Sequence, residues 1–116
     1  EKTLKEGVEQ IRVPYEGMSD ISVKDKSLLF NTDLVETLEF DNLISQALTT
    51  MDSAYNRRES RGAHAREDFT KRDDKNFMKH TLAWQNGNKV EIKYRDVHSR
   101  TLTNDVQYFP PKERVY

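Results

Sequence analysis

The chain has 116 residues, of which 34% are hydrophobic and 34% are charged. Soluble domains usually have roughly 45–50% apolar and about 25% charged residues, so this chain has few side chains with which to build a core. We therefore expect another protein surface to complete its apolar packing. A formal net charge of −1 gives no overall field that favours nucleic acid, and the lack of cysteine excludes disulfides and thiolate metal sites from this chain.

The first element that the sequence predicts is a helix over residues 2–13. Its apolar residues recur three and four positions apart, as on one face of a helix. These residues are Leu4, Val8, Ile11, Tyr15 and Met18. Pro14 lacks a backbone donor and is expected to end or kink the helix. The loop that follows, Ser19 to Phe30, is rich in apolar residues, so we expect it to pack against a neighbour.

A longer helix is expected from Asp33 to Arg61. Asn31, Thr32 and Asp33 offer three capping side chains in a row. Asp33 and Glu36 have the spacing of a capping box, in which the two side chains satisfy backbone donors at the helix start. Apolar residues keep helical spacing from Phe40 to Tyr55. Acids gather at the beginning and arginines at the end, which suits the helix dipole. Gly62 is expected to stop the helix.

A β-hairpin is predicted after a charged, irregular stretch over residues 62–79, with a short turn of helix near Phe77. Apolar residues alternate on both strands. They are His80, Leu82 and Trp84 on the first strand and Val90, Ile92 and Tyr94 on the second. A two-residue Asn86–Gly87 turn would put these rows on opposite faces. We therefore expect a three-residue loop, Asn86–Asn88. It would pair Trp84 with Val90, Leu82 with Ile92 and His80 with Tyr94.

These elements indicate a mainly α fold in two parts. A helical hairpin is expected over residues 1–69, and a small antiparallel β-hairpin with an extended tail over residues 70–116. Pro110–Pro111 favours extended geometry in that tail. No apolar run approaches the 18 or so residues that span a bilayer, and no glycines are spaced to cradle a phosphate. The sequence therefore predicts no membrane segment and no cofactor site in this chain.

The stretch Glu59–Asp68 is the densest candidate site. An Arg–His–Arg group beside carboxylates is able to bind a dicarboxylate or to shuttle protons. We favour the alternative, a helix end whose side chains form ion pairs across a domain contact. The candidates for that contact are Arg57, Arg61, His64 and Arg66.

Metal, hydrolase and nucleic-acid sites receive little support from the sequence. The three histidines, His64, His80 and His98, lie 16 and 18 positions apart, so no metal site is encoded locally. Ser60 and His64 have helical spacing, but the strand–turn–helix elbow of a hydrolase does not precede Ser60. Interleaved acids also neutralise the basic residues around this stretch, so nucleic acid is not an expected partner.

Five segments spread over nearly the whole chain occur in the order of one flavoprotein family. They are Asn31–Glu39, Arg58–Asp68, Lys79–Leu82, Tyr94–Arg95 and Pro110–Tyr116. Together they resemble the flavoprotein subunit of succinate dehydrogenase near its carboxy terminus. The run E-S-R-G-A-H is quite specific, whereas R-x-E-S-R-G alone is shared with fumarate reductase and L-aspartate oxidase flavoproteins. The closing P-P-K-x-R-x-Y favours succinate dehydrogenase.

The resemblance implies that this chain is the non-catalytic carboxy-terminal piece of a larger subunit. The family's enzyme oxidises succinate to fumarate and passes electrons through FAD and iron–sulfur centres to quinone. Its flavin-binding and catalytic residues lie upstream, so the resemblance transfers no catalytic, cofactor-binding or metal-binding residue to this chain. The alternatives are a fragment of fumarate reductase or L-aspartate oxidase, or an independent helical module that binds a partner helix.

The same resemblance implies partners and a location. The partners would be the flavin domain of the same subunit and the iron–sulfur subunit. The location would be the cytoplasmic face of the bacterial inner membrane or the mitochondrial matrix side. The family's helical domain looks like a three-helix bundle, of which this chain holds the last two helices. We expect an exposed apolar groove in place of the first helix, which would allow the isolated chain to self-associate.

Overall fold

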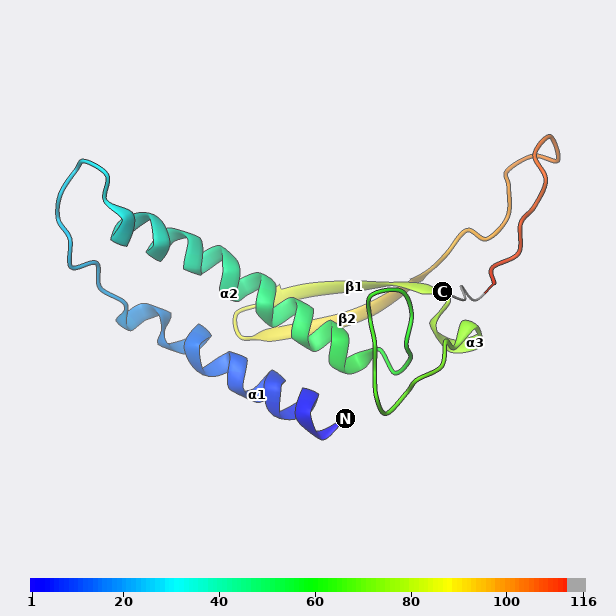
Figure 1. The fold of residues 1–116 in the computed structure, drawn as a ribbon, viewed down its shortest axis with the longest axis horizontal. Coiled ribbons are helices and arrows are strands. Elements are labelled where there is room, and N and C mark those ends of the chain that lie inside the picture. The colour runs from blue at the N-terminus through cyan, green and yellow to red at the C-terminus, as the bar shows by residue number, and fades with distance from the viewer. Residues whose placement is uncertain (113–116) are drawn as a thin grey trace. The chain divides into compact units, whose positions relative to one another are not determined.

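The computed structural model describes residues 1–112 of the chain. It contains two long helices, a 3₁₀ turn, a short helix and a two-stranded sheet (Figure 1). The elements are α1 (Lys2–Glu16), η1 (Gly17–Asp20), α2 (Thr32–Asn56), α3 (Asp74–Phe77), β1 (Lys79–Asn86) and β2 (Lys89–Asp96). The predicted class, helices followed by an antiparallel hairpin, is confirmed. Within the described range, none of the helices combines the length and apolar character of a membrane span.

The described residues divide into two compact units. The helical unit contains residues 1–57 and 83–92, and the loop unit contains residues 58–82 and the described chain from Lys93 onward. The strands β1 and β2 contribute residues to both units. The boundary predicted at residues 69 and 70 stays a prediction.

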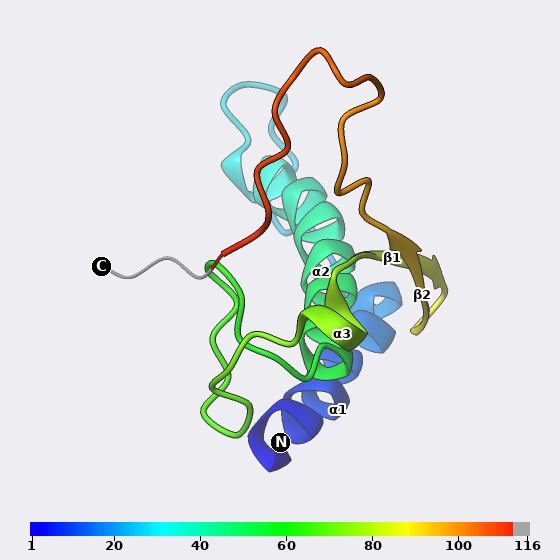
Figure 2. The same cartoon turned by 90° about the vertical axis from the view of Figure 1, so that its right-hand side faces the viewer.

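The helical unit is built on the packing of α1 against α2, which lie side by side in both views (Figures 1 and 2). Val8 of α1 is buried, as are Ile44 and Leu48 of α2. Ile44 and Leu48 are four positions apart, so they share one face of α2. Full burial of such a side chain stabilises the fold by about 1.5–3 kcal/mol. With so few buried apolar side chains in the described range, the core is small.

An ion pair supplements this core within the helical unit. Arg12 Nη2 donates to both carboxylate oxygens of Asp52, each at 3.1 Å, so α1 is bound to α2. Arg12 Nε donates to the carbonyl of Asn88 at 3.1 Å, and Asn88 Nδ2 donates to Glu16 Oε1 at 2.5 Å. Asp52 is only 7% exposed, and the guanidinium compensates its buried charge. The sequence pattern singled out neither Arg12 nor Asp52.

The predicted end of the first helix at residue 13 is wrong. α1 runs to Glu16 and includes Pro14 in its last turn. Proline has a φ that suits a helix, so the backbone continues for two more residues, although Pro14 donates no hydrogen bond to the preceding turn. The chain then tightens into η1, where the Gly17 amide bonds to the carbonyls of Tyr15 and Val13.

The start of α2 differs from the capping box predicted at Asp33. Asn31 is the N-cap, and its Oδ1 accepts a hydrogen bond from the Leu34 amide at 2.8 Å. Asp33 Oδ2 instead accepts from the preceding loop, at 2.8 Å from the Lys24 amide and 3.1 Å from the Asp25 amide. The bonds from the Asp25 and Lys24 amides lower the pKa of Asp33. Sequence spacing alone does not distinguish a side chain that caps α2 from one that binds the preceding loop. Both roles need a carboxylate or amide oxygen near the start of α2.

The predicted end of the long helix at Arg61 is also wrong. α2 ends at Asn56, and Arg57 already has an extended backbone with φ −85° and ψ 100°. Further along, the Ser60 amide donates to the carbonyl of Lys71 at 3.2 Å, so it is unavailable to a helix. Hydrogen bonds to a distant segment therefore replace the helical ladder before Gly62 is reached.

The β-hairpin has a two-residue connection, Gly87–Asn88, because β1 ends at Asn86 and β2 begins at Lys89. The predicted three-residue loop is therefore wrong. Gly87 has a φ of +59°, and glycine at the first position suits one of the two turns that connect hairpin strands most tightly.

The register of the hairpin overturns the predicted pairs of Trp84 with Val90, Leu82 with Ile92 and His80 with Tyr94. Equal strand lengths about the turn place Trp84 opposite Glu91 and Leu82 opposite Lys93. The Val97 amide continues this register by donating to the carbonyl of Met78 at 3.5 Å. The two apolar rows thus lie on opposite faces, and Trp84 is 49% exposed. The prediction failed because it assumed that the hairpin covers a single core.

The helices also leave apolar surface uncovered in the described chain. Four apolar side chains of α2 are 43–61% exposed: Leu34, Val35, Leu38 and Leu43. The uncovered surface agrees with the expected shortage of internal packing. The groove for a further helix stays a prediction.

Residues 97–112 form neither helix nor strand, and bends and a turn interrupt residues 102–106. The Arg100 guanidinium lies 5.7 Å from the ring centre of Tyr108, while Leu102 is fully exposed. The predicted extended tail continues to Tyr116, and its last part, residues 113–116, lies outside the described residues.

Candidate functional site

The candidate site lies in the loop unit, within residues 58–78. Arg61 and His64 exchange backbone hydrogen bonds, at 2.8 Å from the Arg61 amide to the His64 carbonyl and 3.1 Å in the reverse direction. Gly62 and Ala63 therefore form a tight turn, and Gly62 has a φ of +59°. A glycine is suited to this left-handed conformation because it has no Cβ. Gly62 thus serves a turn of the loop instead of ending a helix.

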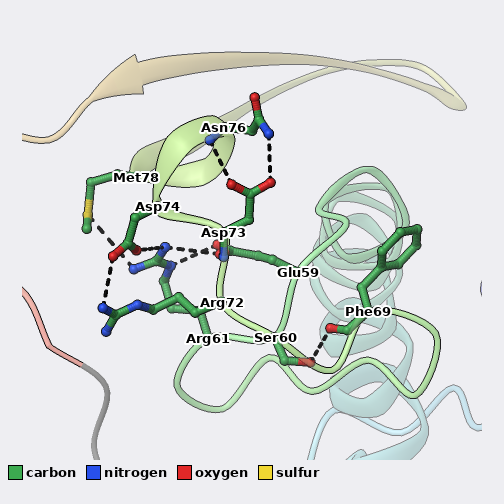
Figure 3. Close-up of polar contacts among 9 residues, drawn as sticks. All are labelled: Glu59, Ser60, Arg61, Phe69, Arg72, Asp73, Asp74, Asn76 and Met78. Atoms are coloured by element: carbon green, nitrogen blue, oxygen red, sulfur yellow. Dashed lines mark hydrogen bonds and ion pairs between the residues drawn. The ribbon is translucent and has the colours of Figure 1, made fainter.

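Glu59 is the fully buried centre of this segment, with an exposed fraction of 0%. Its Oε1 accepts from Arg61 Nε at 2.8 Å, and its Oε2 accepts from Arg61 Nη2 at 3.0 Å (Figure 3). Oε2 also accepts from the Asp73 amide at 2.8 Å. A buried carboxylate is costly unless its oxygens are paired and hydrogen-bonded, and Glu59 meets both conditions. The hydrogen bonds that Arg61 donates to Glu59, and then the one that it donates to Asp74, raise the pKa of Arg61.

Asp74 extends the ion pair outward. It accepts from Arg61 Nη2 at 2.6 Å and from Arg72 Nη2 at 2.8 Å (Figure 3). Arg61, and then Arg72, lower the pKa of Asp74. The neighbouring Asp73 accepts from the side chain of Asn76 at 2.7 Å and from its amide at 3.0 Å, which lowers the pKa of Asp73 and caps α3.

Ser60 ties the two ends of the loop together through its hydroxyl group. The hydroxyl donates to the carbonyl of Phe69 at 2.8 Å and accepts from the Arg66 amide at 2.8 Å. Figure 3 shows the contact between Ser60 and Phe69. A hydroxyl engaged in this way holds the backbone in place. This geometry favours a structural role for Ser60 over the nucleophile of a hydrolase.

Arg66 is the second buried charge of the loop unit, with 4% exposure. It donates to the two oxygens of Asp68 at 2.7 and 2.6 Å, and its guanidinium lies 5.1 Å from the ring centre of Phe69. The Arg66 hydrogen bonds hold the pKa of Asp68 well below its ordinary value. Arg66 therefore faces the interior of its own loop.

The predicted contact set is divided between the two units. Arg61, His64 and Arg66 lie in the loop unit, whereas Arg57 follows α2 in the helical unit. Sequence reasoning missed the central role of Glu59 and Asp74. The available signal was the alternation of acids with arginines, which is typical of internal ion pairs as well as of solvated surface.

The polar contacts of this arrangement support a structural role. Within residues 1–112, no group of three or more His, Asp and Glu side chains is placed to hold a metal ion. The turns at Gly62 and Gly87 do not lead into long helices, so neither forms the phosphate cradle of a flavin site. The ion pairs of this segment fix the shape of a loop.

The comparisons with known proteins match the helical hairpin and this loop together. The whole chain, residues 1–116, matches the family described as fumarate reductase flavoprotein C-term. The chain therefore belongs to the carboxy-terminal region of the succinate dehydrogenase and fumarate reductase flavoproteins, and the resemblance seen in the sequence is confirmed.

Individual relatives agree with this family. The mitochondrial succinate dehydrogenase flavoprotein subunit of Oryza sativa subsp. japonica is 52% identical over 116 residues, which are 100% of this chain and 18% of the relative. The Rickettsia bellii succinate dehydrogenase flavoprotein subunit is 50% identical over 117 residues, covering 100% of this chain and 20% of that protein. This chain thus spans about a fifth of the length of these relatives.

A solved structure has the same fold. A variant of the E. coli quinol fumarate reductase subunit FrdA superposes with a TM-score of 0.81 at 34% identity, covering 99% of this chain and 19% of that one. A quinol-fumarate reductase with menaquinol has a TM-score of 0.77 at 35% identity, covering 88% and 18% of the two chains.

Proposed function

We propose that this chain is a non-catalytic structural domain of a succinate dehydrogenase flavoprotein subunit. The observation that carries the proposal is the family match over the whole chain, together with relatives named as flavoprotein subunits that are about five times longer. The complete subunit would oxidise succinate to fumarate with FAD and pass electrons through iron–sulfur centres to quinone. This domain would stabilise the flavin-binding part of that subunit.

The proposed partners rest on the family resemblance, since the relatives are named as subunits. They are the flavin domain of the same polypeptide and the iron–sulfur subunit of the complex. The proposed location is peripheral, at the cytoplasmic face of a bacterial inner membrane or on the mitochondrial matrix side. The relatives include both a mitochondrial and a bacterial protein.

Fumarate reduction is the second candidate activity of the complete subunit. The fumarate reductase flavoprotein of Mycobacterium tuberculosis is 40% identical over 115 residues, and the matched solved structures are fumarate reductases. The direction of the reaction depends on groups outside this chain. Turnover of the intact enzyme with succinate and with fumarate separates the two activities.

The test compares three proteins in the presence of FAD and succinate. The isolated chain should be colourless and inactive, the intact subunit should bind flavin, and the subunit without residues 1–116 should lose flavin and assembly. Flavin absorbance and succinate oxidation are the measurements. An isolated chain that turned yellow and oxidised succinate, or a truncated subunit with full flavin and assembly, would refute the proposed role.

The contact with the flavin-binding part is proposed to involve Arg57, Arg61, His64 and Arg66. The loop that carries three of them is rigid, because buried ion pairs and the Ser60 hydroxyl support it. Arg61→Ala in the intact subunit should lower flavin content and assembly, and Lys71→Ala, at an exposed position of the same loop, is the control. Unchanged flavin content, assembly and turnover after Arg61→Ala would remove Arg61 from the contact.

A further inference from the structure

The loop that joins α1 to α2, drawn in cyan in Figure 1, ends in three consecutive apolar residues. Leu28 is 98% exposed, Leu29 is 80% exposed and Phe30 is 99% exposed. Single exposed apolar residues are common, but a contiguous exposed group marks an interaction site. We call Leu28, Leu29 and Phe30 the apolar tip.

Hydrogen bonds hold the loop behind the apolar tip in one shape. Asp33 Oδ2 accepts from the amides of Lys24 and Asp25, and Asn31 Nδ2 donates to the carbonyls of Asp25 and Ser27 at 2.9 and 3.0 Å. Asp25 Oδ1 in turn accepts from the Ser27 amide at 2.8 Å. A loop fixed in this way loses little conformational freedom when it binds a partner.

The backbone of the apolar tip is strained. Phe30 has a φ of +49°, a left-handed conformation that is rare for a bulky residue. Such strain persists where it is useful or where its surroundings impose it. The left-handed backbone does not bury the phenyl ring of Phe30 within the described chain, because the residue is almost fully exposed.

Charges of both signs lie beside the apolar tip. Residues 23–30 contain Lys24, Lys26 and Asp25. The Asp33 carboxylate lies against the same loop, where it accepts from the Lys24 and Asp25 amides. The two lysines are therefore balanced by two carboxylates, and the apolar side chains are the feature that a partner surface has to match.

We propose that the apolar tip anchors this domain in an apolar pocket on the remaining part of its own flavoprotein subunit. The inference rests on the proposed function. The relatives carry about four-fifths of their length outside the region matched here. A partner surface on the same polypeptide has a high effective concentration, so a small anchor of three side chains suffices to hold it.

Phe30→Asn in the intact flavin-loaded subunit tests the anchor. Asparagine tolerates a positive φ, so the substitution relieves the strain while it removes the ring. A merely local role predicts equal or greater stability, whereas anchoring predicts a fall in the thermal midpoint of at least about 2 °C. Leu102→Asn is the matched control, because Leu102 is 100% exposed and lies in the tail. It should leave the midpoint unchanged.

A photo-cross-linking side chain in place of Leu29 identifies the partner. Cross-links to the same polypeptide outside residues 1–116 support the proposal. Cross-links to another subunit or to a second copy overturn it, as does a midpoint that Phe30→Asn leaves unchanged or raises. The proposed function fails separately, if the subunit without residues 1–116 keeps its flavin and assembles normally.

Discussion

The helical unit and the loop unit bury different kinds of side chain. Val8, Ile44 and Leu48 are buried in the helical unit, whereas the buried side chains described for the loop unit are Glu59 and Arg66. Apolar burial is non-directional and scales with area, but a buried charge persists only with well-placed partners. We therefore expect the helical unit to be sensitive to lost volume and the loop unit to lost hydrogen bonds.

The largest expected effect is that of Leu48→Ala in the helical unit. Leu48 is 0% exposed, and leucine-to-alanine changes in a core cost about 2–5 kcal/mol. Urea unfolding of the purified chain, followed by far-UV circular dichroism, measures the loss. Leu43→Ala is the control, because Leu43 lies on the same helix but is 61% exposed. Equal losses at the two positions would show that α2 is not packed through Leu48.

The next largest effect is expected for Glu59→Gln in the loop unit. The change keeps the volume but removes the charge that Arg61 binds, and hydrogen bonds to charged groups contribute about 1.5–3 kcal/mol each. Faster hydrogen exchange of the Asp73 amide, which donates to Glu59, is the specific readout. Glu67→Gln, at an exposed position, should leave that exchange unchanged. If the Asp73 amide exchanged at the same rate in Glu59→Gln as in the unchanged chain, the expected sensitivity of the loop unit to lost hydrogen bonds would be contradicted.

A smaller effect on stability is expected for Asn31→Ala, which removes a polar contact of the helical unit. The substitution removes the cap on the Leu34 amide, which costs about 1 kcal/mol for a typical helix. Asn42→Ala is a suitable control, because the bond described for the Asn42 side chain is a long one, to the carbonyl of Leu38 at 3.4 Å. The helical signal and the urea midpoint are the measurements. A loss as large as that of Glu59→Gln would remove the contrast between the two units.

The smallest effect on stability is expected for the protonation of each single carboxylate at low pH. The pKa values of Asp68, Asp73 and Asp74 in the loop unit lie below the ordinary value of 3.8, as does that of Asp33 in the helical unit. A lowered pKa means that the folded chain prefers the ionised form. The resulting stability is complete well above pH 3.8 and is lost as the pH falls through the lowered values.

More of these groups lie in the loop unit, so we expect its amides to lose protection before those of α1 and α2 in an acid titration followed by hydrogen exchange. The control is a second titration at high salt, which should reduce the difference because these carboxylates are partly exposed to solvent. Simultaneous loss of protection in both units would contradict this order.

Much of the fold follows from local patterns. The spacing of Leu4, Val8 and Ile11 predicted α1, and the run from Phe40 to Tyr55 predicted α2. The alternation of apolar residues around Gly87 predicted the β-hairpin, though its register was wrong. Patterns of this kind depend on neighbours within a few residues, so they are visible in the sequence.

The candidate site was less accessible to sequence reasoning. The predicted role of Arg61 and Arg66 in a domain contact stays a prediction, and the sequence did not show that Glu59 and Asp68 bind them within the loop. A guanidinium at a surface and one in an internal ion pair have the same sequence signature. The position of the partner carboxylate in space separates the two cases.

The sequence by itself determined the order of the helices and strands and the family, because hydrophobic periodicity and family motifs are properties of contiguous residues. The tertiary structure alone decided which charges pair. Arg12 and Asp52 are 40 positions apart, and Glu59 binds the amide of Asp73 across 14 positions. Contacts over such distances depend on how the chain turns between them, since a carboxylate accepts hydrogen bonds from whichever donors the fold brings within reach.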